Sequence, residues 1–356
     1  MMETTLTFPV RRAAQSRRPH LDFDQLVFGK EPSDHLFISE FAEGEWQNPR
    51  IEPFHDLRLS PFALALHYGQ TIFEGMKAFR MNDGRIAIFR PDKHYERLTR
   101  SLERMCMPGM SYDFFLQALH ELIDLEREWV PDQPDAALYI RPFMFASEAR
   151  LGVKVSDEYV FMIVTTPVGQ YYAKPLRVKV ELEFIRAATG GTGDVKCGGN
   201  YGAAYYPTQQ ARAEGFDQVL WTDSHRHEFI EESGTMNVMF IIDDVLITPP
   251  LTSTILDGIT RDSILKLAQL RGMMTEERPV SIHELKAALN AGKRVEAFGA
   301  GTAAVVAPIE WIQIGPQGYN CYTGADALMF TFKQELQAIR TGARPDIFGW
   351  NYVLDK

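Results

Sequence analysis

The sequence predicts a two-domain α/β protein with α+β organisation in each half, and three observations support this. The chain has 356 residues, which exceeds one average domain. Helical and β-type hydrophobic patterns are mixed in both halves, without a regular βαβ series. The polar segment 167–175 contains Pro and Gly and separates two halves of different pattern. We therefore expect a smaller N-terminal domain over 1–166, a linker over 167–175 and a larger C-terminal domain over 176–356.

The first half begins with what we expect to be a loose arm over residues 1–22. The arm carries several arginines, like a transit peptide, but it lacks the apolar core of a signal peptide. Helical spacing follows in two segments, 93–107 and 111–130, and Ser111 is a suitable N-cap for the second. Short β-rich runs at 84–89, 137–145 and 159–168 predict strands.

The second half is expected to begin with a half-exposed strand over 176–184, because apolar and charged residues alternate there. Residues 237–250 predict a hairpin that turns at Asp243–Asp244, and 294–308 predict a strand that leads into a Gly-rich turn. Helices are predicted over 258–272, 281–292 and 325–342. The first of these ends at Gly272 and the second opens with a capping box of Ser281 and Glu284. The residues expected to face inward on the first are Ile264, Leu265, Leu267, Ala268 and Leu270.

Composition and charge narrow the class of protein. The chain is 45% hydrophobic with a formal net charge of −10, which indicates a globular core and disfavours nucleic acid or an anionic membrane as a partner. No apolar run reaches the roughly 20 residues that span a bilayer. The three cysteines, Cys106, Cys197 and Cys321, are far apart and odd in number, so no disulfide framework or zinc ribbon is expected. This pattern fits a reducing cytoplasm.

Three motifs can be set aside. The stretch 299–304, GAGTAA, lacks the third glycine of a dinucleotide fingerprint, and GGTGDVKCGG lacks the Gly-Lys-Ser/Thr of a P-loop. His225 and His227 flank Arg226 in a polar loop. A metal site is conceivable there, but a solvated turn is favoured.

Lys196 stands out because it lies among small residues, in GDVKCGGNYGAA. A lysine that attacks a carbonyl needs a neutral amine, which burial or neighbouring cations provide. Pyridoxal phosphate is the common cofactor that requires such a lysine. It also requires a phosphate cradle, an acid at its pyridine nitrogen and a donor to its phenolate oxygen.

The rest of the chain offers each of these parts. Gly198 and Gly199 would let a flat ring approach the backbone, and Tyr201 could donate to the phenolate. Glu231 or Glu232 could face the pyridine nitrogen, although an acidic turn alone would explain both. Candidate phosphate ligands are the start of a helix at Gly258, Ile259 and Thr260, a second small turn with Thr302, and Arg90.

With these motifs in order, the chain resembles the branched-chain amino acid aminotransferases, which are pyridoxal phosphate enzymes of fold type IV. The resemblance rests on KCGGNY, EESGTMN, GITRDSI and GAGTAA in the second half. In the first half it rests on LVFGKEPSDHLF, LHYGQTIFEGMKAFR, IFRP and LYIRPF. It extends from about Leu26 to the last helix, and the long first motif is more like the mitochondrial, cytosolic and some bacterial members than the short enteric type.

The resemblance implies a role for each candidate residue. Lys196 would be the Schiff-base lysine and proton shuttle, Tyr201 would bond the phenolate oxygen, and Glu232, favoured over Glu231, would face the pyridine nitrogen. The phosphate would be held by Arg90, Ile259, Thr260 and Thr302, with Thr235 close by. Tyr68, Arg141 and the backbone of Thr302 and Ala303 would lie near the substrate carboxylates. The side-chain pocket would be lined by Phe28, Phe73, Tyr139, Tyr171 and Thr235, with Leu151 and Val153 from the partner subunit of a homodimer.

The implied reaction is reversible, ping-pong transfer of the amino group of leucine, isoleucine or valine to 2-oxoglutarate, with the cofactor between the two domains. Mammalian members carry a Cys-x-x-Cys pair after the Gly-Thr-Ala turn, but here the residues are Ala304–Val305–Val306–Ala307, so the redox switch proposed for those relatives should be absent. Two enzyme alternatives stay open, D-amino-acid aminotransferase and aminodeoxychorismate lyase. A catalytically inactive ligand-binding homologue is the alternative from another class.

Overall fold

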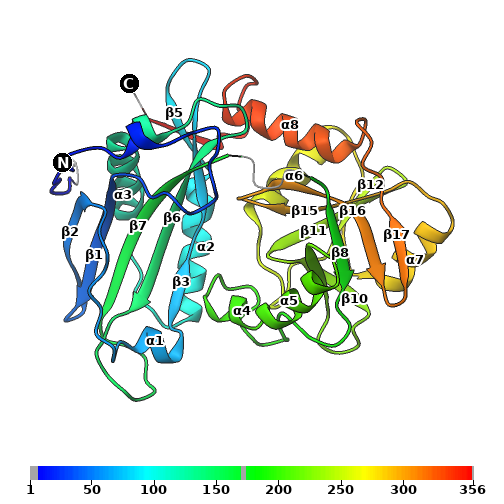
Figure 1. Ribbon diagram of the computed structural model, residues 1–356, viewed down its shortest axis with the longest axis horizontal. Coiled ribbons are helices and arrows are strands. Elements are labelled where there is room, and N and C mark those ends of the chain that lie inside the picture. The colour runs from blue at the N-terminus through cyan, green and yellow to red at the C-terminus, as the bar shows by residue number, and fades with distance from the viewer. Residues whose placement is uncertain (1–6, 170–173, 355–356) are drawn as a thin grey trace. The chain divides into compact units, whose positions relative to one another are not determined.

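The computed structural model describes residues 7–169 and 174–354, and the chain folds as two compact units. The first unit comprises Met1–Tyr171 together with Ala338–Lys356, and the second comprises Tyr172–Gln337. Figure 1 shows each unit built around its own sheet. No helix within the described ranges combines the length and apolar character needed to cross a bilayer.

The first unit contains an antiparallel sheet in the order β18-β5-β4-β6-β7-β1-β2, with β3 also pairing with β6. Within the described residues, the strands of this sheet pair with one another antiparallel. The strands are β1 (His35–Ala42), β2 (Glu45–Pro53), β3 (Thr71–Phe73), β4 (Met76–Arg80), β5 (Ile86–Phe89), β6 (Ala137–Ala146), β7 (Tyr159–Val168) and β18 (Asn351–Leu354). The expected strands at 84–89, 137–145 and 159–168 are therefore confirmed.

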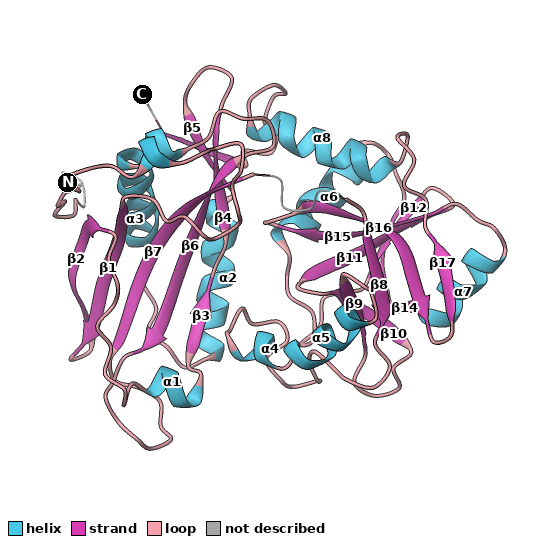
Figure 2. Cartoon of the chain, in the orientation of Figure 1, coloured by secondary structure: helices cyan, strands magenta, loops and turns pink. Residues whose placement is uncertain are grey.

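Both expected helices of the first unit are present. The helices are α1 (Leu64–Tyr68), α2 (Pro91–Arg104) and α3 (Tyr112–Leu125), with the short 3₁₀ turns η1 (Arg18–His20) and η2 (Arg127–Trp129). As expected, the Ser111 hydroxyl caps α3 by accepting a hydrogen bond from the Phe114 N–H at 3.1 Å. Contacts join α2 to β3, α3 to β1 and the two helices to each other, so both cover the sheet (Figure 2).

The N-terminal arm contacts the sheet and α3 of the first unit from Phe8 onward, so the expectation of a loose arm over 1–22 is wrong for most of the part that the structure describes. Val10 bridges Ile51, and the Arg17 N–H donates to Asp34 Oδ1 at 2.8 Å. Phe8 is 6% exposed, with its ring centroid 5.0 Å from that of Phe37. The arm carries four arginines, Arg11, Arg12, Arg17 and Arg18, and so looked like a solvated segment. The sequence shows neither the apolar residues that contact Phe8 nor the buried Asp34 that binds Arg17.

Phe8→Ala is expected to lower the free energy of unfolding by about 3 kcal/mol, because it removes a buried aromatic side chain and leaves a cavity. Val10→Ala is the matched control, since Val10 is 47% exposed on the same arm. Urea denaturation of both variants measures the difference, and equal stabilities would show that the arm contributes nothing to the core.

The strands of the second unit form a closed ring. Among the described residues, the sheet runs β13-β12-β11-β15-β16-β8-β9-β10-β14, and an additional β10–β11 pairing closes β11-β15-β16-β8-β9-β10 on itself. Side chains from these strands form the core of this unit, including Val178, Leu220, Val238 and Phe240. The strands are β8 (Leu176–Val180), β9 (Gln218–Thr222), β10 (Phe229–Ser233), β11 (Met236–Ile242), β12 (Val245–Thr248), β13 (Thr275–Glu277), β14 (Val280–Ser281), β15 (Val295–Gly301), β16 (Val305–Ile314) and β17 (Gln317–Asn320).

The helices of the second unit confirm three sequence expectations and correct two details. They are α4 (Gly199–Gly202), α5 (Tyr205–Ala213), α6 (Ile259–Leu270), α7 (Ile282–Asn290) and α8 (Leu328–Arg340), the last of which ends within the first unit. Leu270 is 53% exposed rather than inward, because it lies on the last turn of α6. Ser281 caps α7 through the His283 N–H, but Glu284 pairs with Arg278 instead of completing a capping box.

The second unit also contains the expected hairpin at Asp243–Asp244. Ile242 pairs with Val245, and both aspartates have positive φ, 51° and 61°. Aspartate tolerates this left-handed conformation better than most residues, which explains why the turn was recognisable from sequence.

The expected domain division needs one correction, because residues 338–356 do not belong with the second unit. Strand β18 pairs with β5, with Asn351 opposite Phe89, and so extends the first sheet. With these residues included, the N-terminal unit is not the smaller one. Part of the predicted linker, 170–173, lies outside the described residues, between the end of β7 at Val168 and the start of β8 at Leu176.

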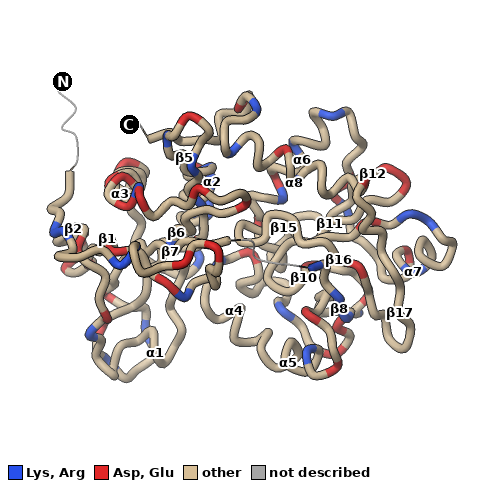
Figure 3. Tube along the Cα trace, turned by 45° about the horizontal axis from the view of Figure 1, so that its top comes forward, with Lys and Arg blue, Asp and Glu red and all other residues tan. Residues whose placement is uncertain are grey.

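Charged residues of both signs are spread along the trace (Figure 3). The short helix α4 carries no charged residue, and the amine of Lys196 lies beside it.

Candidate active site

Lys196 lies half-buried in the loop that enters α4, and its amine faces a tyrosine. Lys196 Nζ donates to the Tyr201 hydroxyl at 3.2 Å. Tyr201 lies within α4, five residues further along, so one short helical turn brings the hydroxyl to the amine. The structure therefore joins two of the residues that sequence predicted would act together.

Asn200 fixes the loop that carries Lys196. Its amide Nδ2 donates to the carbonyls of Thr192 at 2.6 Å and Val195 at 2.8 Å, and its Oδ1 accepts from the Thr192 hydroxyl at 2.8 Å. The Asn200 side chain thus fixes the backbone on the N-terminal side of Lys196. Sequence reasoning missed this role, although the Asn lies inside the KCGGNY motif.

Glu232 is a buried carboxylate at the end of β10, with 3% exposure. Its Oε1 accepts from the Leu256 N–H at 2.9 Å, and its Oε2 lies 3.1 Å from Arg186 Nε. Arg186 also donates to the Gly193 carbonyl at 3.0 Å, in the loop before Lys196. The ion pair therefore connects the acid to the lysine loop, and Arg186 is a second residue that sequence reasoning missed.

The adjacent Glu231 has a different environment. Its Oε1 accepts from the Thr254 hydroxyl at 2.6 Å, and its Oε2 has no hydrogen-bond partner among the described residues. Burial raises the pKa of the Glu231 carboxyl above its ordinary value, and the hydrogen bond from Thr254 and the charge of Arg186 only partly offset this. Among the residues that the structure describes, Glu232 has a cation at ion-pair distance and Glu231 has none, so the two carboxyls differ in environment.

A pocket in the second unit brings the candidates together. It is lined by Arg186, Gly193, Val195, Asn200, Tyr201, Ala204, Glu232, Gly234, Thr235 and Leu256. Lys196 is not one of the lining residues, but its amine contacts the hydroxyl of one of them, Tyr201. A phenol and a carboxylate at one hollow, with an amine next to the phenol, can bind a polar planar ring at several points of its edge.

The candidate phosphate ligands of the second unit lie next to this carboxylate. Ile259 and Thr260 are buried in the first turn of α6, at the positive end of the helix dipole, which favours an anion. Asn237 connects this turn to Glu232, since its Nδ2 donates to the Leu256 carbonyl at 2.8 Å and lies 3.5 Å from Glu232 Oε1. Gly258 must be glycine, because a Cβ there would lie 1.7 Å from Asn237 Oδ1.

Thr302 and Ala303 form the turn between β15 and β16, two strands of the same ring. Their neighbour Ala300 pairs with Asn237, which in turn pairs with Glu232. Val305, the first residue of β16, has φ 63°, an uncommon and strained conformation for a β-branched residue. The turn at Thr302 and Ala303 and the carboxylate of Glu232 therefore lie at the same end of the ring of strands.

In the first unit, Arg90 occupies a strained position at the start of α2. It is the N-cap residue with φ 52°, it is 2% exposed and its guanidinium lies 5.1 Å from the centroid of the Trp350 ring. The N–H of Arg90 donates to the carbonyl of Trp350, the residue before β18, so the C-terminal segment helps to hold Arg90.

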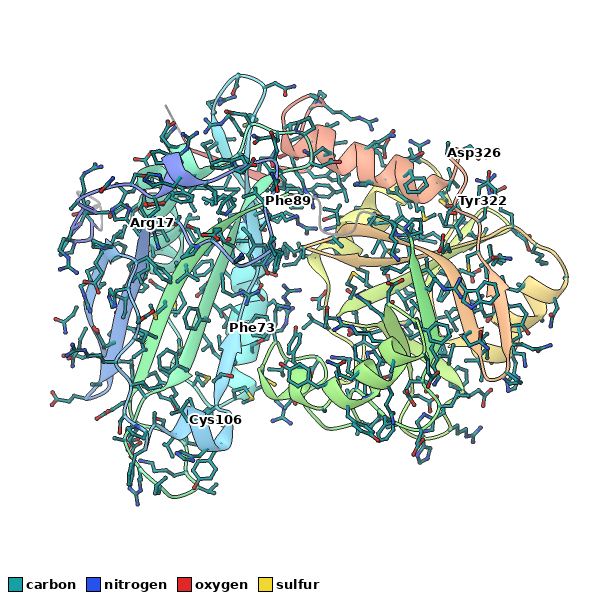
Figure 4. The ribbon with its side chains drawn as sticks, viewed as in Figure 1. Arg17, Phe73, Phe89, Cys106, Tyr322 and Asp326 are labelled. Carbon is teal, nitrogen blue, oxygen red and sulfur yellow. The ribbon has the colours of Figure 1, made fainter. Side chains whose placement is uncertain are left out.

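Four candidate substrate residues of the first unit, Arg141, Phe73, Tyr139 and Phe28, form one cluster. The Arg141 guanidinium lies 4.8 Å from the ring of Phe73, labelled in Figure 4, and 5.2 Å from that of Tyr139. Arg141 Nη2 donates to the Tyr139 hydroxyl at 3.0 Å, and the rings of Tyr139 and Phe28 are 4.9 Å apart. Arg141 Nε has no hydrogen-bond partner among the described residues, so the group retains a donor.

The remaining candidates form a separate surface or lie outside the described residues. Tyr68, Leu151 and Val153 are exposed by 43%, 56% and 83%. They lie on two adjoining segments, since Ala63 bridges Ala149. Tyr171 falls in the stretch that the structure does not describe.

A fully buried ion cluster in the first unit was not recognised from sequence. Glu74, inside the FEG of the long motif, binds Arg97 through two bonds of 2.7 and 2.8 Å and lies 2.8 Å from His94 Nδ1. His94 and Arg97 are three residues apart on α2 and share a face, a spacing that could have indicated a common partner. Although burial acts to raise it, Arg97 and His94 hold the pKa of Glu74 below its ordinary value of 4.5.

Glu74→Gln is expected to lower the free energy of unfolding by about 3–5 kcal/mol at pH 7, because it leaves Arg97 buried without a counter-charge. A carboxyl with a depressed pKa contributes stability above its unfolded pKa and loses it as the pH falls. The difference between wild type and variant should therefore shrink below about pH 4.5. Denaturant titrations at several pH values test this, with the exposed Glu96→Gln on the same helix as control. If Glu74→Gln lowered the free energy of unfolding no more than Glu96→Gln, the buried cluster would not contribute to stability as expected.

The His225–Arg226–His227 loop is a turn organised by Asp223. The carboxylate of Asp223 accepts from four backbone N–H groups, those of His225, Arg226, Glu228 and Phe229. Burial acts to raise the pKa of Asp223, but these bonds hold it below its ordinary value. Within the part of the chain that the structure describes, no group of His, Cys, Asp and Glu is arranged to hold a metal.

Fold and site together define an aminotransferase. The model of the amino-transferase class IV family matches residues 71–312, which is more than half of the chain. The chain therefore belongs to the class IV aminotransferases and is a pyridoxal 5′-phosphate-dependent transaminase of fold type IV, as the resemblance implied.

The relatives narrow the family further. Branched-chain-amino-acid transaminase 1 of Bacillus subtilis is 45% identical over 298 residues, which are 82% of this chain and 84% of the relative. Branched-chain-amino-acid aminotransferase 2 of the same organism is 40% identical over 94% of both chains. The Escherichia coli branched-chain amino acid aminotransferase structure superposes with a TM-score of 0.72 at 25% identity, over 91% of this chain and 99% of that one. Within class IV, the chain belongs to the branched-chain amino acid aminotransferase family.

The fold is supported independently of sequence identity. The structure of branched-chain aminotransferase from Thermobaculum terrenum superposes with a TM-score of 0.74 at only 22% identity, over 90% of this chain. The predicted fold type IV architecture is thus confirmed.

Proposed function

We propose that the protein transfers the amino group of leucine, isoleucine or valine to 2-oxoglutarate, reversibly and by a ping-pong sequence. The observation that carries this is the Lys196–Tyr201 pair, 3.2 Å apart, beside the pocket that Glu232 lines. A ping-pong sequence follows because donor and acceptor use the same site in turn.

The donor set fits pyridoxal phosphate, because one hollow offers a phenol and a carboxylate, and an amine lies 3.2 Å from that phenol. The start of α6 follows in the same unit. When bound, the cofactor supplies an aldehyde that accepts the amino group and a ring that withdraws electrons. Lys196 would hold it covalently and carry the proton at the substrate Cα on its Nζ. Tyr201 would donate to the ring hydroxyl, and Glu232 would hold the proton at the ring nitrogen. The phosphate would be held by Arg90, Ile259, Thr260, Thr302 and Thr235.

The first unit supplies the substrate groups in this proposal. Phe28, Phe73 and Tyr139 offer an apolar wall for a branched aliphatic side chain. Arg141 offers the partnerless Nε donor to the second carboxylate of glutamate or 2-oxoglutarate. Tyr68, Tyr171 and the backbone of Ala303 would complete the site. This combination of aromatic faces and one guanidinium suits a pocket that must accept both an aliphatic and an acidic side chain.

We propose that the protein is a homodimer. An exposed apolar patch on the first unit supports this. It is formed by Phe62, Leu66, Tyr68, Leu151, Val153 and Val155, each 43–83% exposed. Such a patch on a monomer marks an interaction surface, and Leu151 and Val153 would reach the partner's pocket. Sedimentation of the purified protein tests this, and a monomer at micromolar concentration would rule it out.

A cytoplasmic location is also proposed, and it is supported by three free thiols at Cys106, Cys197 and Cys321.

A donor panel with 2-oxoglutarate tests the function. We expect turnover with L-leucine, L-isoleucine and L-valine, and none with D-alanine. Activity only with D-alanine would favour a D-amino-acid aminotransferase, and pyruvate release from 4-amino-4-deoxychorismate would favour a lyase. A protein that stays colourless when pyridoxal phosphate is added would favour an inactive homologue.

A further inference from the structure

A break in the first sheet lies directly opposite Arg141. Strand β3 ends with Phe73 paired to Phe143, and β4 begins with Met76 paired to Ile140, so Glu74 and Gly75 face Pro142 and Arg141. The Glu74 N–H donates to the Pro142 carbonyl at 2.7 Å, but Pro142 has no N–H to return the second bond of that pair. The ladder is therefore interrupted at the position of the candidate carboxylate-binding residue.

The Glu74 ion cluster replaces the missing ladder contacts. Glu74 is 0% exposed and Arg97 and His94 are 4% and 1% exposed, so the three side chains form a rigid anchor between the break and α2. Glu74 Oε2 also accepts from the Gly75 N–H at 3.1 Å, which fixes the backbone of Gly75.

Gly75 forms the surface against which Tyr139 rests. A Cβ at Gly75 would lie 1.9 Å from the Tyr139 hydroxyl oxygen and 2.8 Å from the ring carbon that carries it. The same hydroxyl accepts the 3.0 Å bond from Arg141 Nη2. The Tyr139 hydroxyl thus lies between Gly75 and the Arg141 guanidinium. Any movement of Gly75 would therefore shift the hydroxyl and, through the hydrogen bond, the guanidinium.

We propose that Glu74, Arg97 and His94 are positioning residues which, through Gly75, hold the Tyr139–Arg141 pair in the geometry that binds a dicarboxylic substrate. The inference rests on the proposed function and deepens it. The cluster sets the preference for 2-oxoglutarate over branched 2-oxo acids, because only the former places a second carboxylate at Arg141. Apolar contacts with Phe28 and Phe73 depend less on the position of one hydroxyl.

Gly75→Ala tests this without touching the ion cluster. We expect the ratio of kcat/KM for 2-oxoglutarate to that for 4-methyl-2-oxopentanoate, with L-isoleucine as the common donor, to fall about tenfold or more. This is the effect of losing one well-aligned charge-assisted hydrogen bond. Gly109→Ala is the matched control, because a Cβ there meets nothing within 4 Å. A merely structural role would lower both values of kcat/KM together and leave their ratio unchanged.

The Tyr139→Phe background provides the decisive comparison. Without the hydroxyl there is no Tyr139–Arg141 hydrogen bond left to displace, so Gly75→Ala should change the ratio little further even though its Cβ would still lie 2.8 Å from the ring carbon. An unchanged ratio in folded Gly75→Ala, or the same fall in the Phe background, would overturn the proposal. Wild-type protein without activity toward either acid would instead overturn the proposed function. Glu74→Gln should lower the same ratio, and Gly75→Ala carries the test if that variant does not fold.

Discussion

Lys196→Ala is expected to lower transamination by at least about 10⁴-fold, because it removes the group that forms the covalent bond and carries the proton. The fold should persist. Lys196 is half-buried, and the bonds from Asn200 to the carbonyls of Thr192 and Val195 hold the loop independently of the lysine side chain.

The measurement is the initial rate with L-leucine and 2-oxoglutarate, together with a fluorescence titration with pyridoxal phosphate. The variant should still bind the cofactor through its phosphate, but without the covalent bond. Lys179→Ala is the control, since Lys179 forms a partly exposed ion pair with Glu214 and contributes little. Retained turnover in Lys196→Ala would refute the assignment of the lysine.

Glu232→Gln is expected to lower kcat by about 10²–10⁴-fold, the range for removing a positioned acid–base group. The amide is nearly isosteric, and its oxygen can still accept from the Leu256 N–H. It cannot supply the negative charge that pairs with Arg186 and that would hold a proton at the ring nitrogen. Arg186, whose side chain is 9% exposed, also loses its counter-charge, so the variant should be less stable as well as slower, and its rate is compared at a temperature where both proteins are folded.

Glu231→Gln is the matched control for this variant. Glu231 is adjacent in sequence and buried, and burial raises the pKa of its carboxyl, so a neutral amide is a conservative replacement. We expect kcat to change by less than about threefold. Stopped-flow spectra of both variants should show a slowed reaction only for Glu232→Gln. A larger effect at Glu231 would mean that the neighbouring carboxyl serves the cofactor.

Local signals made several elements predictable. The Asp243–Asp244 turn, the Ser111 cap and the alternation in β8 each depend on residues close in sequence, and each is present. The same holds for Lys196 and Tyr201, which one helical turn brings together. In these cases the spacing of residues along the chain was enough to predict the structure.

Contacts between distant segments were not predictable. The arm around Phe8 and the strand β18 depend on surfaces formed by residues far away in sequence. The same holds for Glu74, Arg97 and Arg186, because a sequence does not show which charged residues lie close together in the fold. A single sequence thus indicated the reacting groups and missed the residues that support them.

The pairing of β18 with β5 makes the first unit discontinuous along the chain, and this has a consequence for biosynthesis. During translation, β5 emerges more than 250 residues before its edge partner. The nascent unit would thus expose an unsatisfied strand edge while the entire second unit is still being made. Ribosome stalling or truncation before residue 351 should leave that edge open to chaperones or to self-association.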